Sequence, residues 1–273
     1  MISKTAMITI CGRPNVGKST LTNALVGEKI AIVSNKPQTT RNRISAVVNR
    51  GDTQFVIIDT PGFHKPRTRL GDYMVNVVKE SVADVDAVML LVEPIANIGR
   101  QEEELIARIK ETGVPAILVI NKIDTVEKTE LLEVMALYSA AHDFDAIIPM
   151  SAKNGEGIDE LLAELEKYAQ EGPQLFPDDM ICDQPEKQIC AELVREKLLL
   201  CLDKEIPHGT AVEVTRFSER ENGIIDLDVS TVKKRAIRGS SSASRARCSR
   251  RSASLPERTS KPLWEQRSSC RHG

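Results

Sequence analysis

The sequence predicts an α/β protein in which helices cover both faces of a mostly parallel sheet, followed by a smaller α+β domain and a basic tail. Along the first 170 residues, short apolar runs alternate with amphipathic helical patterns, which indicates repeated strand–helix units. Val, Ile and Leu are frequent, while aromatic residues make up only 3% of the chain. With 273 residues, of which 41% are hydrophobic, the chain is long enough for two domains with buried cores.

Six apolar runs are the strand candidates of the first domain, which we place at residues 1–170. In chain order they are residues 7–11, 44–48, 55–58, 87–92, 116–120 and 146–150. Ligands of such sheets collect at the carboxyl ends of the strands. Each of the four motifs described next directly follows one of these ends, so we expect the motifs to form one site.

The first motif is the G-x-x-x-x-G-K-S loop of residues 12–19, which lies between the first strand and a predicted helix at residues 20–26. Its glycines allow backbone N–H groups to face phosphates, and the Lys18 ammonium adds a positive charge. The Ser19 hydroxyl can ligate Mg²⁺ at the helix N-terminus. The loop therefore predicts a nucleoside triphosphate site made of Gly12, Asn15, Val16, Gly17, Lys18, Ser19 and Thr20.

The other three motifs extend this site to a metal ion and a base. In D-T-P-G, Asp59 can hold Mg²⁺ and the Gly62 N–H can face a γ-phosphate. In N-K-I-D, Asp124 can accept hydrogen bonds from the N1–H and 2-amino groups of guanine, which adenine cannot supply. In S-A-K, the Ala152 N–H can meet the guanine O6. The predicted base-binding residues are Asn121, Lys122, Asp124, Ser151, Ala152 and Lys153.

Together with Q-T-T-R at residues 38–41, these motifs resemble the translation-factor-related GTPases, and within them the Era family, over residues 5–230. The resemblance implies a P-loop GTPase domain that hydrolyses GTP to GDP with Mg²⁺. It also implies that Thr40, rather than Thr39, closes on Mg²⁺ and the γ-phosphate, and that residues 30–42 and 62–82 are switch loops. The catalytic residues would be Lys18, Thr40 and Gly62, and the metal ligands Ser19, Thr40 and Asp59.

Three further positions bear on the rate and on metal binding. Phe63 stands where many small GTPases carry a water-orienting glutamine, and a phenyl ring cannot polarise water, so we expect slow turnover. Asn15 resembles the asparagine that helps to hold K⁺ in related GTPases, although it could simply stabilise the loop. We interpret residues 102–104, three glutamates, as a charge cluster at a helix N-terminus rather than a metal site.

The second domain begins after a predicted linker at residues 171–180. A helix at residues 186–204 and strands at residues 210–216 and 223–229 resemble the start of the type II KH domain of Era-like proteins, which we place at residues 181–232. A KH domain clamps the nucleic-acid backbone with a G-x-x-G loop, and this chain lacks one at the corresponding place. Any small α+β domain would fit this stretch nearly as well.

Residues 233–273 form a Ser/Arg-rich tail with a net charge of +10, whereas residues 1–232 carry −12. Composition alone predicts a disordered basic tail. Our hypothesis is that the tail is an out-of-frame reading of the rest of the KH domain, because residues 239–244 can read G-I-I-I-G-K in the neighbouring frame. The break would lie near residues 230–233. If the tail is real, its RNA affinity would be electrostatic and unselective.

The resemblance implies binding to 16S rRNA near its 3′ end and a role in 30S subunit assembly, a partnership that a damaged KH domain could lose. The alternatives are another ribosome- or tRNA-related GTPase of the same superfamily, a P-loop kinase, or a nucleotide-binding module without an RNA partner. We expect a cytoplasmic monomer with a possible peripheral contact at the inner membrane. No apolar run reaches the roughly 18 residues needed to span a bilayer, and the N-terminus does not resemble a secretory signal.

Overall fold

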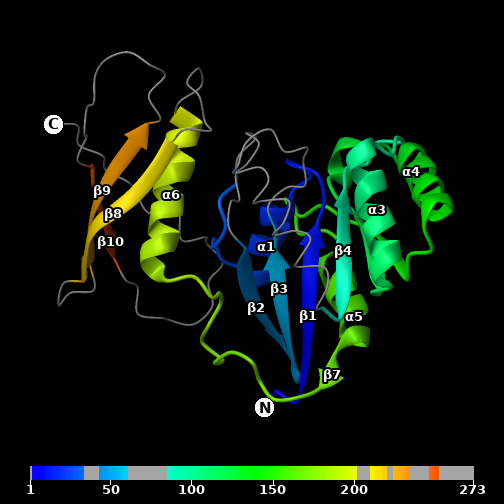
Figure 1. Ribbon diagram of the computed structural model, residues 1–273, viewed down its shortest axis with the longest axis horizontal. Coiled ribbons are helices and arrows are strands. Elements are labelled where there is room, and N and C mark those ends of the chain that lie inside the picture. Colours follow the sequence, from blue (N-terminus) through cyan, green and yellow to red (C-terminus); the bar gives the residue numbers. More distant parts are fainter. Residues whose placement is uncertain are drawn as a thin grey trace. The chain divides into compact units, whose positions relative to one another are not determined.

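The computed structural model describes residues 2–33, 43–60, 85–201, 210–219, 224–233 and 246–251, and Figure 1 shows its helices and strands. The chain divides into two compact units, Met1–Asp183 and Gln184–Gly273. Two predicted site residues, Thr40 and Gly62, lie outside the described residues, as do Phe63, most of residues 30–42 and all of residues 62–82.

The first unit is built on a sheet with the strand order β2-β3-β1-β4-β5-β6, and β7 pairs with β1. The strands are β1 (Lys4–Cys11), β2 (Ile44–Arg50), β3 (Thr53–Asp59), β4 (Ala87–Val92), β5 (Ala116–Ile120), β6 (Ala146–Pro149) and β7 (Gln170–Glu171). Only β2 and β7 run antiparallel to their neighbours. Strand β2 must do so because only Gly51 and Asp52 separate it from β3, and a two-residue turn with Gly51 at φ 60° closes a hairpin. The predicted mostly parallel sheet is confirmed.

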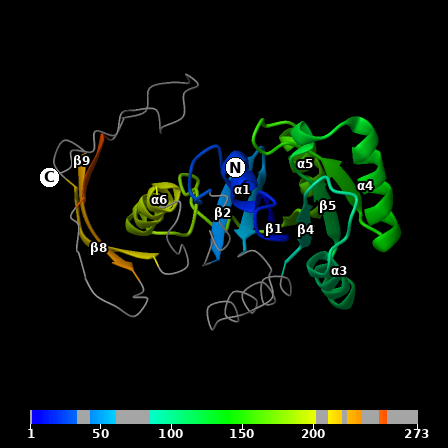
Figure 2. The same ribbon diagram turned by 90° about the horizontal axis from the view of Figure 1, so that it is seen from above.

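Helices cover both faces of this sheet. They are α1 (Lys18–Val26), α3 (Arg100–Thr112), α4 (Lys128–Ala141) and α5 (Ile158–Leu165), with short 3₁₀ helices η1 (Ile123–Thr125) and η2 (Glu166–Tyr168). Figure 2 shows α1 and α5 on one face and α3 on the other. Helix α3 ends because Gly113 adopts φ 66° and donates its N–H to the Ile109 carbonyl, a left-handed cap.

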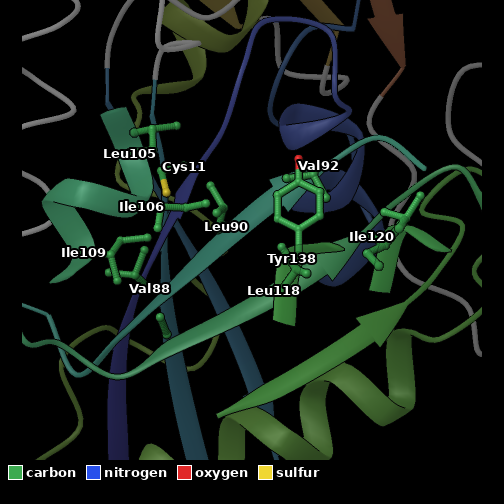
Figure 3. Packing of buried hydrophobic residues seen from close by; sticks show 12 residues of the cluster. Cys11, Val88, Leu90, Val92, Leu105, Ile106, Ile109, Leu118, Ile120 and Tyr138 are labelled. Carbon is green, nitrogen blue, oxygen red and sulfur yellow. The ribbon is translucent and has the colours of Figure 1, made fainter. Parts of the chain in front are cut away.

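One hydrophobic cluster of the described residues packs α3 and α4 against β4 and β5 (Figure 3). Alternate side chains of the two strands face these helices, as expected for a pleated sheet. The buried members of the cluster are Cys11, Val88, Leu90, Val92, Leu105, Ile106, Ile109, Ala116, Leu118, Ile120, Val134 and Tyr138. This close packing fixes the carboxyl ends of β1, β4 and β5, from which the site loops begin.

Residues of the segment 174–183 are hydrogen-bonded to both β2 and β3. The Val47 N–H donates to the Ile181 carbonyl at 2.9 Å, and Ser45 exchanges two hydrogen bonds of 3.0 Å with Asp183. Gln54, which is fully buried, accepts the N–H groups of Leu175 and Phe176 at 2.9 Å. The segment following β7 is therefore part of the first unit rather than a free connection.

The second unit contains α6 (Glu186–Cys201) and an antiparallel sheet of order β10-β9-β8, with β8 (Thr210–Glu219), β9 (Ile224–Lys233) and β10 (Ala246–Arg251). Val214, Leu227 and Val229 are buried, and Cys190, Ala191 and Val194 of α6 pack against them. The order helix, strand, strand agrees with the sequence-based expectation.

Strand β10 differs from that expectation, since residues 233–273 were predicted to be a disordered tail. Its residues pair with β9 from Ala246 opposite Val229 to Arg251 opposite Ile224. The unpaired edge of β9 offers backbone donors and acceptors to any extended segment that reaches it, whatever its composition. The segment of the proposed frame change, residues 239–244, lies outside the described residues. Within the described part of the chain, no helix has both the length and the apolar composition to cross a bilayer.

Candidate nucleotide-binding site

The loop after β1 requires glycine at two positions. Gly12 has φ 151°, and a Cβ atom there would lie 2.4 Å from the backbone oxygen of Leu91 in β4. Gly17 has φ 105°, and a Cβ atom there would lie 2.2 Å from Asn121 Nδ2. Because neither backbone conformation suits an L side chain, these two glycines allow the loop to lie close to β4 and to the N-K-I-D motif.

Lys18, the first residue of α1, is buried and its ammonium group lies over this loop. Nζ donates to the carbonyl oxygens of Gly12 at 3.1 Å and Arg13 at 2.8 Å. Burial lowers the pKa of Lys18 to about 8, and the nearby Asp59 opposes that shift. The lysine therefore stays mostly protonated at neutral pH and is placed to interact with phosphate groups.

Asp59 and Ser19 form the predicted metal-binding pair. Ser19 Oγ donates to Asp59 Oδ2 at 3.0 Å, and the carboxylate is fully buried at the end of β3. Burial raises the pKa of Asp59 to about 6, against the opposing effects of Lys18 and of the Ser19 hydroxyl. Asp59 Oδ1 is buried without a hydrogen-bond partner among the described residues. A buried carboxylate oxygen left free beside a hydroxyl is a donor set suited to Mg²⁺, so both residues fit that ion.

The amide of Asn121 joins three loops. Its Nδ2 donates to the Val16 carbonyl at 2.8 Å, and its Oδ1 accepts the Ala152 N–H at 2.9 Å. The side chain is buried, so these bonds are shielded from water. The Ala152 N–H, which we expected to meet guanine O6, is thus bonded to Asn121 in this structure.

Asp124 lies in η1 with its carboxylate held by the neighbouring motif. Ser151 Oγ donates to Asp124 Oδ1 at 2.7 Å, while the Ser151 backbone pairs with Glu156. This bond fixes one oxygen of the exposed carboxylate and so limits the orientations that Asp124 can adopt. Lys153 is exposed, and Thr20 is half-buried in the first turn of α1.

The structure also reveals three charged residues that our sequence analysis did not assign to the site. Arg13 forms ion pairs with Glu102 and, at 3.7 Å, with Glu93. Glu93 also accepts a hydrogen bond from Lys122 Nζ. Of residues 102–104, Glu102 is buried and bound to Arg13, whereas its two neighbours are exposed. Glu102 stands three residues after the N-cap Gly99, a spacing typical of a capping box, which was the available signal.

The glycine-containing loop after β1, the carboxylate beside Ser19 and the Asn121–Asp124 loop are together typical of a P-loop GTPase. A family model described as "50S ribosome-binding GTPase" matches residues 7–122. GTPase Era of Ruminiclostridium cellulolyticum is 51% identical over 83% of this chain and 76% of its own length. GTPase Era of Clostridium perfringens is 46% identical over 85% of this chain and 79% of its own. The chain belongs to the Era family of GTPases, and it hydrolyses GTP to GDP.

Solved structures agree with this assignment. Era in complex with MgGDPNP and nucleotides 1506-1542 of 16S ribosomal RNA is 34% identical, with a TM-score of 0.81 over 86% of this chain and 80% of that one. A variant of Aquifex aeolicus Era bound to GDP.AlF4- is also 34% identical, with a TM-score of 0.80 over 85% of this chain and 80% of that one. The predicted P-loop GTPase fold and the predicted resemblance to the Era family are both confirmed.

Proposed function

We propose that this chain is a GTP-driven switch that uses Mg²⁺, binds 16S rRNA near its 3′ end and acts in assembly of the small ribosomal subunit. The observation that carries the proposal is the likeness to Era bound to MgGDPNP and 16S RNA, which extends over 86% of the chain. The first unit ends at Asp183 and so holds about two thirds of the 273 residues. A match over 86% of the chain therefore includes part of the second unit as well.

In the proposed mechanism the first unit binds and orients the triphosphate. The Lys18 ammonium, now held by two loop carbonyls, moves to the phosphate oxygens, and the backbone N–H groups of the loop surround them. Ser19 and Asp59 would hold Mg²⁺, which when bound neutralises charge on the phosphates. The roles of Thr40 and Gly62 in this site rest on the sequence resemblance alone.

Guanine selectivity depends on Asp124, whose orientation Ser151 fixes. Isothermal titration calorimetry with GDP and ADP tests this, because adenine offers no N1–H and no 2-amino group to the carboxylate. Adenine would leave the Asp124 carboxylate without these two donors, so we expect GDP to bind at least roughly a hundredfold more tightly than ADP. Equal affinities for the two nucleotides would contradict the assignment.

The rate of hydrolysis should be low for the isolated protein, because Phe63 offers no group that orients water. The proposed K⁺ role of Asn15 rests on the resemblance. This role predicts faster GTP turnover in KCl than in NaCl, and equal rates in the two salts would contradict it.

RNA binding belongs to the second unit in this proposal. The supporting features are the packing of α6 on β8 and β9 and the sequence resemblance to a KH domain. Ultraviolet crosslinking to an oligoribonucleotide of the 16S 3′ end tests it, comparing this chain with a frame-restored chain. Strong, salt-resistant crosslinking of the frame-restored chain alone would support both the RNA role and the frame hypothesis. If neither chain crosslinks, the RNA partner is wrong, whereas GTP binding stands.

The remaining expectations rest on the resemblance and stay predictions. They are a cytoplasmic location, peripheral contact with the inner membrane and a monomeric state. Sedimentation of the purified protein would test the last, and co-sedimentation with anionic lipid vesicles the second.

A further inference from the structure

Four charged side chains of alternating sign connect the phosphate-binding loop to the base-binding loop. In spatial order they are Lys122, Glu93, Arg13 and Glu102. Two of them belong to the site motifs, but the two acids come from the end of β4 and the first turn of α3. The roles assigned to the nucleotide site use neither acid.

Glu93 is the centre of this chain of charges, because each of its oxygens faces a different cation. Its Oε1 accepts a hydrogen bond from Lys122 Nζ, and its Oε2 lies 3.7 Å from Arg13 Nη2. The Glu93 side chain is 26% exposed, so solvent screens these interactions only in part. As the residue directly after β4, Glu93 stands on the packed sheet rather than on a long loop.

Lys122 spans the gap between the two loops. Its Nζ donates to the Asn15 carbonyl at 2.7 Å as well as to Glu93. Asn15 and Lys122 are also the two non-glycine residues with positive φ among the described residues, at 66° and 65°. Such backbone conformations persist when surrounding contacts fix them, and here the two strained residues are bonded to each other.

Arg13 continues the connection to the helix layer. Its guanidinium forms an ion pair with Glu102, which is 1% exposed in the first turn of α3. Gly99 leaves room for that carboxylate, because a Cβ atom there would lie 2.9 Å from Glu102 Oε2. The phosphate-binding loop is thus tied to α3 on one side and to Lys122 on the other.

We propose that Glu93 is a positioning residue for nucleotide binding, which holds the Lys122 ammonium on the Asn15 carbonyl and Arg13 on the sheet. The proposal rests on the nucleotide site proposed above. With Glu93 in place, the phosphate-binding and base-binding loops keep their spacing as nucleotide enters and leaves. Without it, each loop moves separately and bound nucleotide is lost faster.

The test is the release rate of a fluorescent N-methylanthraniloyl GDP, chased with unlabelled GDP in a stopped-flow instrument. Glu93→Gln keeps the shape and removes the charge, so charge-assisted bonds become ordinary ones and release should accelerate roughly tenfold. Glu103→Gln is the matched control, since Glu103 is exposed on α3, and it should change the rate less than about twofold.

A double-mutant cycle separates positioning from general destabilisation. In a Lys122→Met background the main cation that Glu93 holds is gone, so Glu93→Gln should accelerate release at most about threefold. Equal acceleration in both backgrounds, or an unchanged rate for Glu93→Gln alone, would overturn the proposal. Urea midpoints of all variants establish that each is folded.

The preference for GDP over ADP is measured for every variant alongside. It should not change on Glu93→Gln, because Asp124 and Ser151 are untouched. If the unmodified protein shows no such preference, the proposed nucleotide site is wrong. If it does and the cycle gives additive effects, only the role of Glu93 is wrong.

Discussion

Replacing Gly12 by alanine should lower the free energy of unfolding by more than a positive φ alone explains, because the phosphate-binding loop lies close to β4. At Gly12 the new Cβ atom meets the Leu91 backbone oxygen at 2.4 Å, a contact closer than real Cβ atoms make. Leu91 is a buried residue of the central strand β4, so its carbonyl cannot move aside without disturbing the sheet. The loop must shift instead.

The matched control is Gly113→Ala at the end of α3. Gly113 also has a positive φ, 66°, but nothing lies within 4 Å of a Cβ atom there. The control should cost about 1 kcal/mol, the price of the left-handed conformation alone. Gly12→Ala adds a glycine-only backbone region and an overpacked contact, which together should cost about 4 kcal/mol.

Urea unfolding of the nucleotide-free proteins, followed by circular dichroism, measures both free energies. Affinity for labelled GDP should fall more than about a hundredfold for Gly12→Ala and stay within about threefold for Gly113→Ala. If Gly12→Ala loses no more stability than the control and still binds GDP, the close approach of the loop to β4 is not what the site requires.

Three further outcomes follow from particular contacts. Burial raises the pKa of Asp59 to about 6, so this carboxylate is mostly ionised at pH 7 and mostly protonated at pH 5. The Mg²⁺ affinity of the GTP-bound protein should therefore weaken about tenfold between these two pH values. Titration of Mg²⁺ at pH 7 and at pH 5 measures the change. Asp59→Asn should bind Mg²⁺ weakly at both pH values, with only the smaller change that comes from protonation of GTP itself. Asp124→Asn should lose GDP and gain xanthosine diphosphate by calorimetry, since an amide can donate to the xanthine 2-carbonyl; retained GDP binding would refute the role of Asp124. Gln54→Ala leaves the N–H groups of Leu175 and Phe176 without an acceptor and should cost about 2 kcal/mol in urea unfolding, and an unchanged midpoint would contradict that.

The sequence was sufficient for the fold class and for locating the loops that carry the predicted nucleotide site, because those signals are local. Eight consecutive residues, 12–19, carry the phosphate-binding loop, and the other motifs each follow an apolar run. The role of Glu102 could not be predicted in this way. Its position in a run of three glutamates indicated only the N-terminus of a helix, because its partner Arg13 is far away in the sequence. Glu93 had no motif of its own, and its role depends on β4 ending between two loops.

The same limit explains the second unit and the segment before it. Strand β10 has a composition that predicts no strand, and only the free edge of β9 accounts for it. Residues 171–180 read as a linker, yet Gln54, the second residue of β3, holds part of that segment by three hydrogen bonds. Neither the pairing of β10 with β9 nor the bonding of Gln54 to this segment can be predicted from the local amino-acid composition.

The bonding of Ser45 to Asp183 joins two distant points of the polypeptide at the very residue where the first unit ends. Ser45 stands five positions downstream of Thr40 in the sequence, so the residue predicted to contact the γ-phosphate and the exit toward the second unit are both close in sequence to a residue of this bonded pair. A rearrangement that displaced the start of β2 on loss of γ-phosphate would therefore displace the exit as well, with no need for a signal to cross the hydrophobic interior.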